Sequence, residues 1–420
     1  MIGARSAEII AVGSELLTPF RLDTNSLWLT GRLDDLGLPV RHKTVVGDDL
    51  ADLQAAVRTA LGRADVVITT GGLGPTSDDL TRDAVAAVLG LPLTEDAATL
   101  ERIRERFARR GVEMPAVNRR QALVPRGATL LPNANGTAPG IFIETAEGDR
   151  VVVLLPGPPR ELQPMFDAAV VPRLAPLGSG HAPRRRVLKI TGRTESQVEE
   201  LAHPIYSTLG GPRVTVATSI LASSGLIEIH LVATGPPADA DRLLDDGVTA
   251  LERALAPAVY SLDGRALEVV VGDALRARGW RVAAAESCTG GLLLGRLTEV
   301  PGSSDYVLGG VVAYDNAVKV ALLDVPQTTL AAHGAVSEPV GRAMAEGARR
   351  RFGADLAVAV TGIAGPGGGS DAKPVGTVVV ALDGPHPVVR TLRLPGDRAM
   401  VRALSVNAAL DLIRRACAGA

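Results

Sequence analysis

The chain has 420 residues, of which 46% are hydrophobic and only 3% are aromatic. At about 100 to 200 residues per domain, this length predicts roughly two to four domains, and three is the central expectation. The 44 Lys and Arg residues are balanced by 46 Asp and Glu residues, which gives a formal net charge of -2. Such a balance creates no basic field that would attract nucleic acid or anionic lipid, so we expect a small-molecule substrate.

Signals for export or membrane insertion are missing from the sequence. The two cysteines, Cys288 and Cys417, give no indication that they pair in a disulfide. The first residues read as a strand entering a turn rather than as a signal peptide. No apolar stretch approaches the roughly 20 residues that span a bilayer. We therefore expect a cytoplasmic protein with no membrane partner.

Short apolar runs alternate with helical patterns from residue 7 to about 170. The alternation predicts repeated βαβ units and a mostly parallel sheet, and cores of Ala, Val and Leu suit such helix-covered sheets. Open α/β sheets bind ligands at the carboxyl ends of their strands, where Gly- and Asp-rich turns follow here. We predict a first α/β domain at residues 1–170, with candidate ligand loops GSELL (13–17), GGLGPTSDD (71–79) and LPGPPRE (155–161).

A stretch rich in Pro and Gly at about 172–183 suits a linker. The sequence around and after it predicts a small αβ unit at residues 171–258. Its strands are expected at 185–192, 213–220 and 225–235, and its helices at 195–205 and 238–255. This unit carries no evident nucleophile or ligand cluster, so a spacer or a dimerisation module is the simplest interpretation.

The third unit, residues 262–420, again follows an α/β pattern. Strands are expected at 280–287, 307–314, 355–362, 376–382 and 388–394, and helices at 266–279, 290–300, 316–323, 338–353 and 397–416. No repeat of fixed period joins the three units, which excludes a solenoid. The expected fold class is therefore α/β, in three units.

The segment ESCTGG, residues 286–291, stands where a buried strand ends and a helix begins. Gly290 and Gly291 allow another group to approach the backbone, and the free amides of a helix start favour negative charge. An oxyanion could therefore be stabilised beside Ser287, which makes this serine a candidate nucleophile. The alternative is an ordinary helix start capped by Ser287 or Thr289.

A serine hydroxyl needs a base to become a nucleophile, and none of the six histidines stands in a Ser/His/Asp signature. Lys319 follows the strand predicted at 307–314, at the sheet edge where ESCTGG should also lie. A partly buried lysine there could have a lowered pKa and act as the base, while Tyr314 relays or orients the proton. The alternative is a solvated helix lysine.

Two further features lie near the end of the chain. Thr361 and Gly362 open the Gly-rich loop TGIAGPGGG, which matches neither a Walker A motif nor a dinucleotide fingerprint but permits a close backbone wall around a ligand. Arg398 and Arg402 lie one turn apart near the start of the last helix and could hold a phosphate. A tolerant surface loop and a solvated helix face are the alternatives.

Six segments of the third unit together resemble the carboxy-terminal domain of the CinA family, the nicotinamide mononucleotide deamidase. They are ESCTGG, GSSDYVLGGVVAYDNAVK, HGAVSE, VTGIAGPGGG, KPVGTV and GDRAMVR. The resemblance implies hydrolysis of nicotinamide mononucleotide to nicotinate mononucleotide and ammonia, in pyridine nucleotide salvage, without a metal or other cofactor. It further implies that Ser287 is the nucleophile, Lys319 the base and Tyr314 its helper. Substrate contacts are then expected from Glu286, Thr289, Gly290, Gly291, Asn316, Ser337, Thr361, Gly362, Arg398 and Arg402.

The first unit resembles the amino-terminal domain of the same family, a relative of molybdopterin-binding domains, through VGSELL, DTN, TGGLGPTSDDLT, NGTAPG and LPGPPRE. The resemblance implies a pterin-like or nucleotide ligand, and some members hydrolyse the pyrophosphate of ADP-ribose to AMP and ribose 5-phosphate. Asp78 and Asp79 are then expected to hold a divalent metal ion against a diphosphate, and the alternative is that they are ordinary dipole partners in a first helical turn. Expected ligand contacts are Glu15, Asn25, Gly72 and Gly74. The family usually carries a glycine shortly after GxELL, whereas Thr18, Pro19 and Phe20 follow here.

The middle unit resembles the KH-type linker domain of the family, and the family implies a homodimer. Because this unit has no GXXG loop and no net basic charge, nucleic acid is not expected as a partner. A non-catalytic pterin- or nucleotide-binding sensor or assembly protein is the alternative function. Within the third unit, attack by a Cys288 thiolate is the alternative mechanism, since a helix start can lower a thiol pKa.

Overall fold

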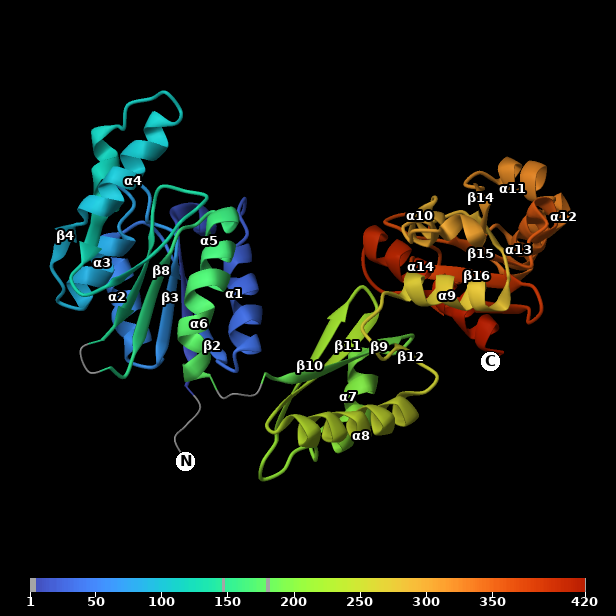
Figure 1. The fold of residues 1–420 in the computed structure, drawn as a ribbon. Coiled ribbons are helices and arrows are strands. Elements are labelled where there is room, and N and C mark those ends of the chain that lie inside the picture. The colour runs from blue at the N-terminus through green and yellow to red at the C-terminus, as the bar shows by residue number, and fades with distance from the viewer. Residues whose placement is uncertain (1–4, 146–147, 179–181, 420) are drawn as a thin grey trace. The chain divides into compact units, whose positions relative to one another are not determined.

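The computed structural model describes residues 5–145, 148–178 and 182–419, and Figure 1 shows its helices and strands. Two compact units divide the chain, Met1–Pro183 and Arg184–Ala420. The first unit extends past the predicted boundary at residue 170, because residues 171–177 are helical and Leu174 is buried in the core of that unit. Of the predicted linker, residues 179–181 lie outside the described residues.

The amino-terminal unit is built on a six-stranded sheet of order β2-β1-β3-β8-β7-β6. The first four strands are parallel and the last two antiparallel, so the predicted parallel sheet is a mixed one. The strands are β1 (Ala7–Val12), β2 (Val40–Val46), β3 (Val66–Thr70), β6 (Thr129–Leu131), β7 (Gly140–Glu144) and β8 (Val151–Leu155). Every residue of β1, β3 and β8 is buried, as expected for parallel strands covered on both faces.

Helices cover both faces of this sheet. One face packs on α1 (Thr24–Asp35), α5 (Pro159–Met165), the π-helical turn Phe166–Val170 and α6 (Val171–Leu174). The other face packs on α2 (Leu50–Leu61) and α3 (Thr81–Val88). A separate small cluster joins α4 (Ala97–Ala108) to the 3-10 helix Ala116–Ala122, and β4 (Leu93–Glu95) pairs with β5 (Leu123–Pro125). Short 3-10 helices also form at Ser14–Leu17 and Ala175–Leu177.

The middle part of the chain has the element order β9 (Arg184–Thr191), α7 (Glu195–Tyr206), β10 (Thr215–Ser223), β11 (Leu226–Thr234), α8 (Pro237–Leu255), β12 (Val259–Ser261). All neighbours in its sheet, of order β10-β11-β9-β12, are antiparallel. Residues on β11 alternate between buried and half-buried, because α7 and α8 cover one face. This is the split-βαβ arrangement. The predicted KH-type domain is not confirmed.

The carboxy-terminal part carries a five-stranded sheet of order β14-β13-β15-β16-β17. Its strands are β13 (Val282–Glu286), β14 (Val307–Val312), β15 (Leu356–Gly362), β16 (Thr377–Asp383) and β17 (Val388–Arg393). β14, β13 and β15 are parallel, and β16 and β17 run antiparallel. The fold is thus mixed α/β, as the sequence predicts.

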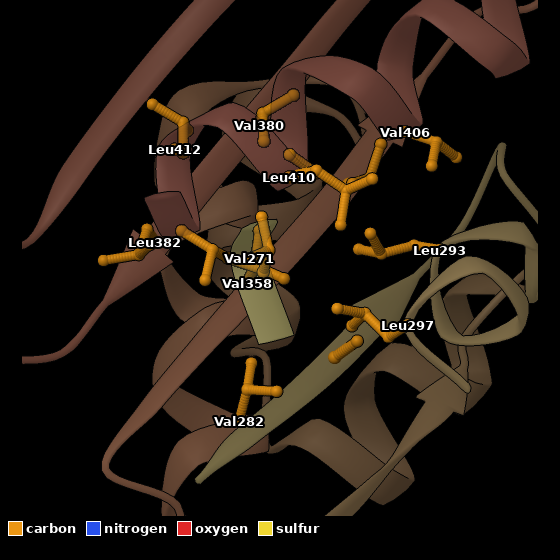
Figure 2. Packing of buried hydrophobic residues seen from close by; sticks show 14 of the residues in the cluster. Val271, Val282, Leu293, Leu297, Val358, Val380, Leu382, Val406, Leu410 and Leu412 are labelled. Carbon is orange, nitrogen blue, oxygen red and sulfur yellow. The ribbon is translucent and has the colours of Figure 1, made fainter. Parts of the chain in front are cut away.

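Two helical layers enclose this sheet. Val282, Val358 and Val380 face α9 (Leu267–Arg278), α10 (Leu292–Thr298) and α14 (Arg398–Ala418), and Figure 2 shows their packing. The alternate residues, several of them alanines, face α11 (Asn316–Leu323) and α13 (Glu338–Phe352). The sequence missed α12 (Gln327–His333) and the 3-10 turn Ser303–Asp305. None of the helices in the described parts of the chain is both long and apolar enough to span a membrane.

Candidate active site at the carboxyl edge of the second sheet

The register of three parallel strands fixes the position of Ser287. Glu286, the last residue of β13, pairs with Val312 of β14 and Val360 of β15. The Ser287 amide donates to the Val360 carbonyl at 2.8 Å, which extends the pairing of β13 with β15 by one residue. Ser287 is 8% exposed, and its hydroxyl makes no hydrogen bond with a described residue. The predicted nucleophile therefore lies at the carboxyl edge of the sheet with its hydroxyl free.

Glu286 shapes the loop that follows it. Its fully buried carboxylate accepts hydrogen bonds from the amides of Gly291, Leu293 and Leu294 at 2.9, 3.1 and 2.9 Å. These amides belong to the start of α10, whose positive end therefore faces a carboxylate from the protein itself. From the sequence, these amides were expected to face the substrate and Glu286 to contact it. The structure corrects both expectations, because carboxylate and amides satisfy one another.

Two other amides remain available beside Ser287. Within the described part of the chain, the main-chain N–H groups of Cys288 and Thr289 donate to no protein acceptor. The Thr289 hydroxyl is also buried without a partner. Free donors that follow a nucleophile directly are the usual components of an oxyanion hole. The amides that could stabilise an oxyanion are therefore those of the ESCTGG turn, and not those of the first turn of α10.

Lys319 is almost completely buried, with an exposed fraction of 1%. Its Nζ atom donates to the main-chain carbonyl of Tyr314 at 3.1 Å, and the described residues offer it no salt bridge. Burial lowers the pKa of Lys319, while Asp315 and the neighbouring Cys288 thiol act in the opposite direction. A lysine in this state can give up its proton more easily than a solvated one. The alternative of a solvated helix lysine is excluded.

Tyr314 serves the site mainly through its backbone. Its carbonyl holds Lys319, whereas its ring is 59% exposed and its hydroxyl accepts a hydrogen bond from Arg398 Nη2 at 2.9 Å. No hydrogen bond joins the hydroxyl to Lys319 within the described residues. The proton relay predicted for the phenol is therefore absent in this arrangement.

Arg398 and Arg402 reach into the site from the first turns of α14. Arg398 Nη1 donates to the Gly365 carbonyl at 2.8 Å, and Arg402 Nη2 donates to the Thr289 carbonyl at 2.8 Å. The Arg402 Nε atom is buried without a partner. Both side chains thus tie α14 to the two loops of the site and keep unused donors. Arg402 is half-buried, whereas Arg398 stays exposed while it bonds the Gly365 loop and Tyr314.

The Cys288 thiol is buried beside the nucleophile. A Cβ atom added at Gly362 would lie 3.1 Å from Cys288 Sγ, which explains the small residue at that position. Burial raises the pKa of the Cys288 thiol to about 11, and the Glu286 carboxylate adds to the increase. A thiol is nucleophilic only as thiolate. The structure therefore disfavours the alternative in which Cys288 attacks.

Of the remaining predicted substrate contacts, some hold loops of the site and others are exposed or set the backbone. Thr361 is buried, and its hydroxyl donates to the Ala335 carbonyl at 2.9 Å. Ser337 donates to the Gly334 carbonyl at 2.8 Å. Both hydroxyls thus brace loops at the sheet edge. Asn316 opens α11 as an exposed side chain, while Gly290 and Gly291 adopt positive φ angles of 60° and 94°, which only glycine tolerates well.

A second cluster of predicted residues lies at the carboxyl edge of the first sheet. Asp79 folds the Gly-rich loop after β3, because its carboxylate accepts from the Gly74 amide, the Thr76 amide and the Thr76 hydroxyl at 2.7, 2.8 and 2.5 Å. An added Cβ at Gly74 would lie 2.4 Å from that carboxylate, so a larger residue there would displace the Asp79 side chain. Gly72 has φ +64°, and an added Cβ there would lie 2.2 Å from Thr81 Oγ1. These residues build the loop.

Asp79 can offer a metal ion at most one lone pair, on Oδ1, because its oxygens already accept three hydrogen bonds from Gly74 and Thr76. Nowhere in the described ranges do three His, Cys, Asp or Glu side chains gather as metal ligands. Asp78 is exposed and would hold a divalent ion only together with the phosphates of a substrate. Exposed Glu15 folds over Gly13, and Asn25 Nδ2 donates to the Gly157 carbonyl at 2.7 Å, which ties the start of α1 to the loop at 155–161.

Sequence reasoning missed two features of these sites. The free amides of Cys288 and Thr289 depend on where α10 begins, which composition does not reveal. Arg82, in the first turn of α3, is the largest fully buried side chain of the chain as described. The sequence gives no signal for it, since an arginine in a first helical turn is ordinarily solvated.

Two mixed α/β sheets, each with candidate ligand loops at the carboxyl edge, define a molybdopterin-binding-like domain followed by a CinA domain. Residues 8–176 match the "Probable molybdopterin binding domain" and residues 264–417 match the "CinA C-terminal domain". A competence-damage inducible protein of Desulforudis audaxviator is 46% identical over 97% of this chain and 98% of its own length. A CinA-like protein of Solibacter usitatus is 45% identical over 98% of each chain. The chain belongs to the CinA family.

Solved structures also match this chain. The competence/damage inducible protein CihA from Agrobacterium tumefaciens is 42% identical, and the match covers 36% of this chain and 93% of that one, with a TM-score of 0.35. A CinA superfamily protein from Klebsiella pneumoniae is 38% identical, over 37% of this chain and 97% of that one, with a TM-score of 0.36.

Proposed function

We propose that the carboxy-terminal domain hydrolyses the carboxamide of nicotinamide mononucleotide to nicotinate mononucleotide and ammonia. The observation that carries this proposal is the buried Lys319, whose pKa is lowered by burial, at the sheet edge that presents the free Ser287 hydroxyl. Burying a lysine without a carboxylate partner costs stability, and such residues occur preferentially at functional sites. Serine activated by lysine is an established solution for attack on an amide carbonyl.

In the proposed first step, neutral Lys319 accepts the proton of the Ser287 hydroxyl while Ser287 Oγ forms a bond to the carboxamide carbon. The negative charge that develops on the carboxamide oxygen is stabilised by the amides of Cys288 and Thr289. Collapse of this intermediate breaks the C–N bond, and the nitrogen leaves as ammonia with the proton from Lys319. Water activated by Lys319 then hydrolyses the acyl-enzyme and releases nicotinate mononucleotide.

The substrate phosphate is the part of the ligand that the arginines would hold. Arg398 and Arg402 each use one nitrogen on a loop carbonyl, which leaves further donors for phosphate oxygens. The same contacts keep the Gly365 loop and the ESCTGG turn together around the pyridine ring. We therefore expect the mononucleotide to be preferred over free nicotinamide.

The test is ammonia release by the full chain from nicotinamide mononucleotide, nicotinamide riboside and nicotinamide. The proposal expects fast release from the mononucleotide and slow release from the two ligands that lack phosphate. Tight binding of the mononucleotide without ammonia release would favour the alternative, a non-catalytic nucleotide sensor. No binding and no release would reject both.

A second activity is proposed for the amino-terminal domain, the hydrolysis of ADP-ribose to AMP and ribose 5-phosphate with a divalent ion. Within the described residues, the amides of Gly72 and Leu73 donate to no protein acceptor, and such a pair of successive amides is suited to phosphate oxygens. Chromatography of ADP-ribose incubated with the full chain and a range of divalent ions tests this activity. If no AMP forms, a binding role remains for this domain. Cytoplasmic location and a homodimer remain part of the proposal.

A further inference from the structure

Arg82 is a fully buried cation that the protein leaves almost without partners. Its side chain is 1% exposed, and Nη2 donates to the Leu73 carbonyl over a long 3.4 Å contact. Nε and Nη1 are buried and have no hydrogen-bond partner. Buried guanidinium groups are normally saturated with acceptors, because an unpaired buried charge is costly. Arg82 is therefore an exception, and a bound anion nearby would stabilise its charge.

The carboxylates near Arg82 do not supply that counter-charge by direct contact. Asp79 uses both oxygens on the Gly-rich loop, and Asp83 pairs with Arg120 at 3.3 Å. Arg120 also acts on Arg82 as a like charge. Burial lowers the pKa of Arg82 to about 10, so the guanidinium still carries its full charge at neutral pH.

The guanidinium lies against the Gly-rich loop, where Nη2 contacts the carbonyl of Leu73. Two hydrogen bonds from Thr81 hold the same loop to the start of α3. The Thr81 amide donates to the Gly72 carbonyl, and the Thr81 hydroxyl donates to the Gly71 carbonyl. The free amides of Gly72 and Leu73 belong to this same stretch. One short segment thus combines unused N–H donors with a buried positive charge that Asp83 and Asp79 compensate only from a distance, without a hydrogen bond.

We infer that Arg82 is the buried counter-charge of an anion site at residues 71–74, which takes the diphosphate of a nucleotide. The inference deepens the activity proposed for the amino-terminal domain and rests on it. The loop amides contact the phosphate oxygens, while Arg82 acts through the loop as a positioning residue and raises affinity electrostatically. Because arginine cannot lose its proton near neutral pH, it contributes to binding and not to proton transfer.

A purely structural role makes a different prediction. An arginine that only held the loop in place would lose affinity and Tm together on replacement, whereas a buried charge kept for binding can be replaced by an apolar residue of similar volume without loss of stability. Arg82→Met should therefore fold with an unchanged or higher Tm and yet bind inorganic pyrophosphate more weakly. Arg82→Lys, which keeps the charge, should retain most of the affinity.

The experiment measures inorganic pyrophosphate binding by calorimetry, on the full chain carrying Arg402→Ala to weaken the second arginine site. We expect a roughly 10- to 100-fold loss of affinity for Arg82→Met and at most about a threefold loss for Arg82→Lys. The matched control is Arg58→Met, which removes an exposed arginine of α2 and should change nothing. If Arg82→Met does not fold, Arg82→Gln takes its place.

Three results would overturn the inference. They are an undiminished affinity in Arg82→Met, an equal loss in Arg82→Lys and Arg82→Met that parallels a fall in Tm, and no pyrophosphate binding by the parent protein. Hydrolysis is scored separately by AMP formation. Arg82-dependent pyrophosphate binding without AMP formation would remove the proposed hydrolase activity and leave the anion site in place.

Discussion

Each of the two α/β domains hides one cation near the carboxyl edge of its sheet, Arg82 in the first and Lys319 in the second. Both side chains are 1% exposed, and each makes one hydrogen bond, to a main-chain carbonyl. Burial lowers both pKa values, but arginine keeps its proton in a folded protein, whereas lysine can release it. The same burial thus prepares a base in one domain and a fixed positive charge in the other.

The strongest test of this contrast removes the nucleophile that Lys319 is proposed to activate. Ser287→Ala should reduce ammonia release more than about 10,000-fold, because no other group can form the acyl-enzyme. Calorimetry should show nearly unchanged binding of nicotinamide mononucleotide. Cys288→Ala, which keeps the main-chain amide, should retain most of the rate. A dead but folded Cys288→Ala beside an active Ser287→Ala would transfer the reaction to the thiol.

Replacing Lys319 with arginine, the cation of the other domain, tests whether the lysine acts as a base. Lys319→Arg keeps the charge but cannot release a proton, so ammonia release should fall about 100- to 10,000-fold, as in Lys319→Ala. In the parent protein the rate should rise with pH through the lowered pKa of Lys319 and then level off, because the neutral form is the base. A pH series of initial rates checks both. An active Lys319→Arg would show that the lysine only binds.

The buried carboxylate of Glu286 offers a smaller effect, on stability. Glu286→Gln replaces a charged acceptor of three amides with a neutral one and should lower the free energy of unfolding by about 2–4 kcal/mol. Thermal denaturation followed by circular dichroism measures this change. The exposed Glu299 at the other end of α10 is the control, and Glu299→Gln should leave Tm nearly unchanged. Equal shifts in both variants would contradict the assigned role.

The smallest expected effect is that of an amino-terminal substitution on the rate of ammonia release. Asp79→Ala removes the carboxylate that folds the Gly-rich loop, so it should weaken pyrophosphate binding and abolish any AMP formation. Ammonia release should stay within about twofold of the parent, since sites in two separately packed units that share no partner behave independently. Loss of both activities in a folded variant would mean that the sites communicate.

Much of the architecture could be predicted from the sequence because its periodicities are plain. The predicted helix at 316–323 coincides with α11, and Ser287, Lys319 and Arg402 do gather around one sheet edge. The antiparallel strands β16 and β17 were expected as strands, but their direction depends on a turn that propensity does not encode. The KH-type interpretation of the middle unit was not confirmed, because strand content says little about strand order.

The roles within the sites were harder to predict, since they depend on hydrogen-bond partners. Glu286 and Asp79 both stand in polar motifs, and each proves to hold its own loop through main-chain amides. The sequence could not distinguish a carboxylate that faces a ligand from one that faces a helix start. Arg82 was missed because nothing in its spacing shows that its side chain turns inward.

The last helix, α14, has a consequence for how the protein is made. It supplies Val401, Val406, Leu410 and Ile413 to the core of the second sheet, as well as both site arginines. During synthesis α9 and α10 can cover only part of that face, and the rest stays exposed until α14 has left the ribosome. The amino-terminal unit, complete by residue 183, can fold much earlier. Newborn chains should therefore bind anions before they can release ammonia, and chaperones should meet chiefly the exposed valines of the unfinished second sheet.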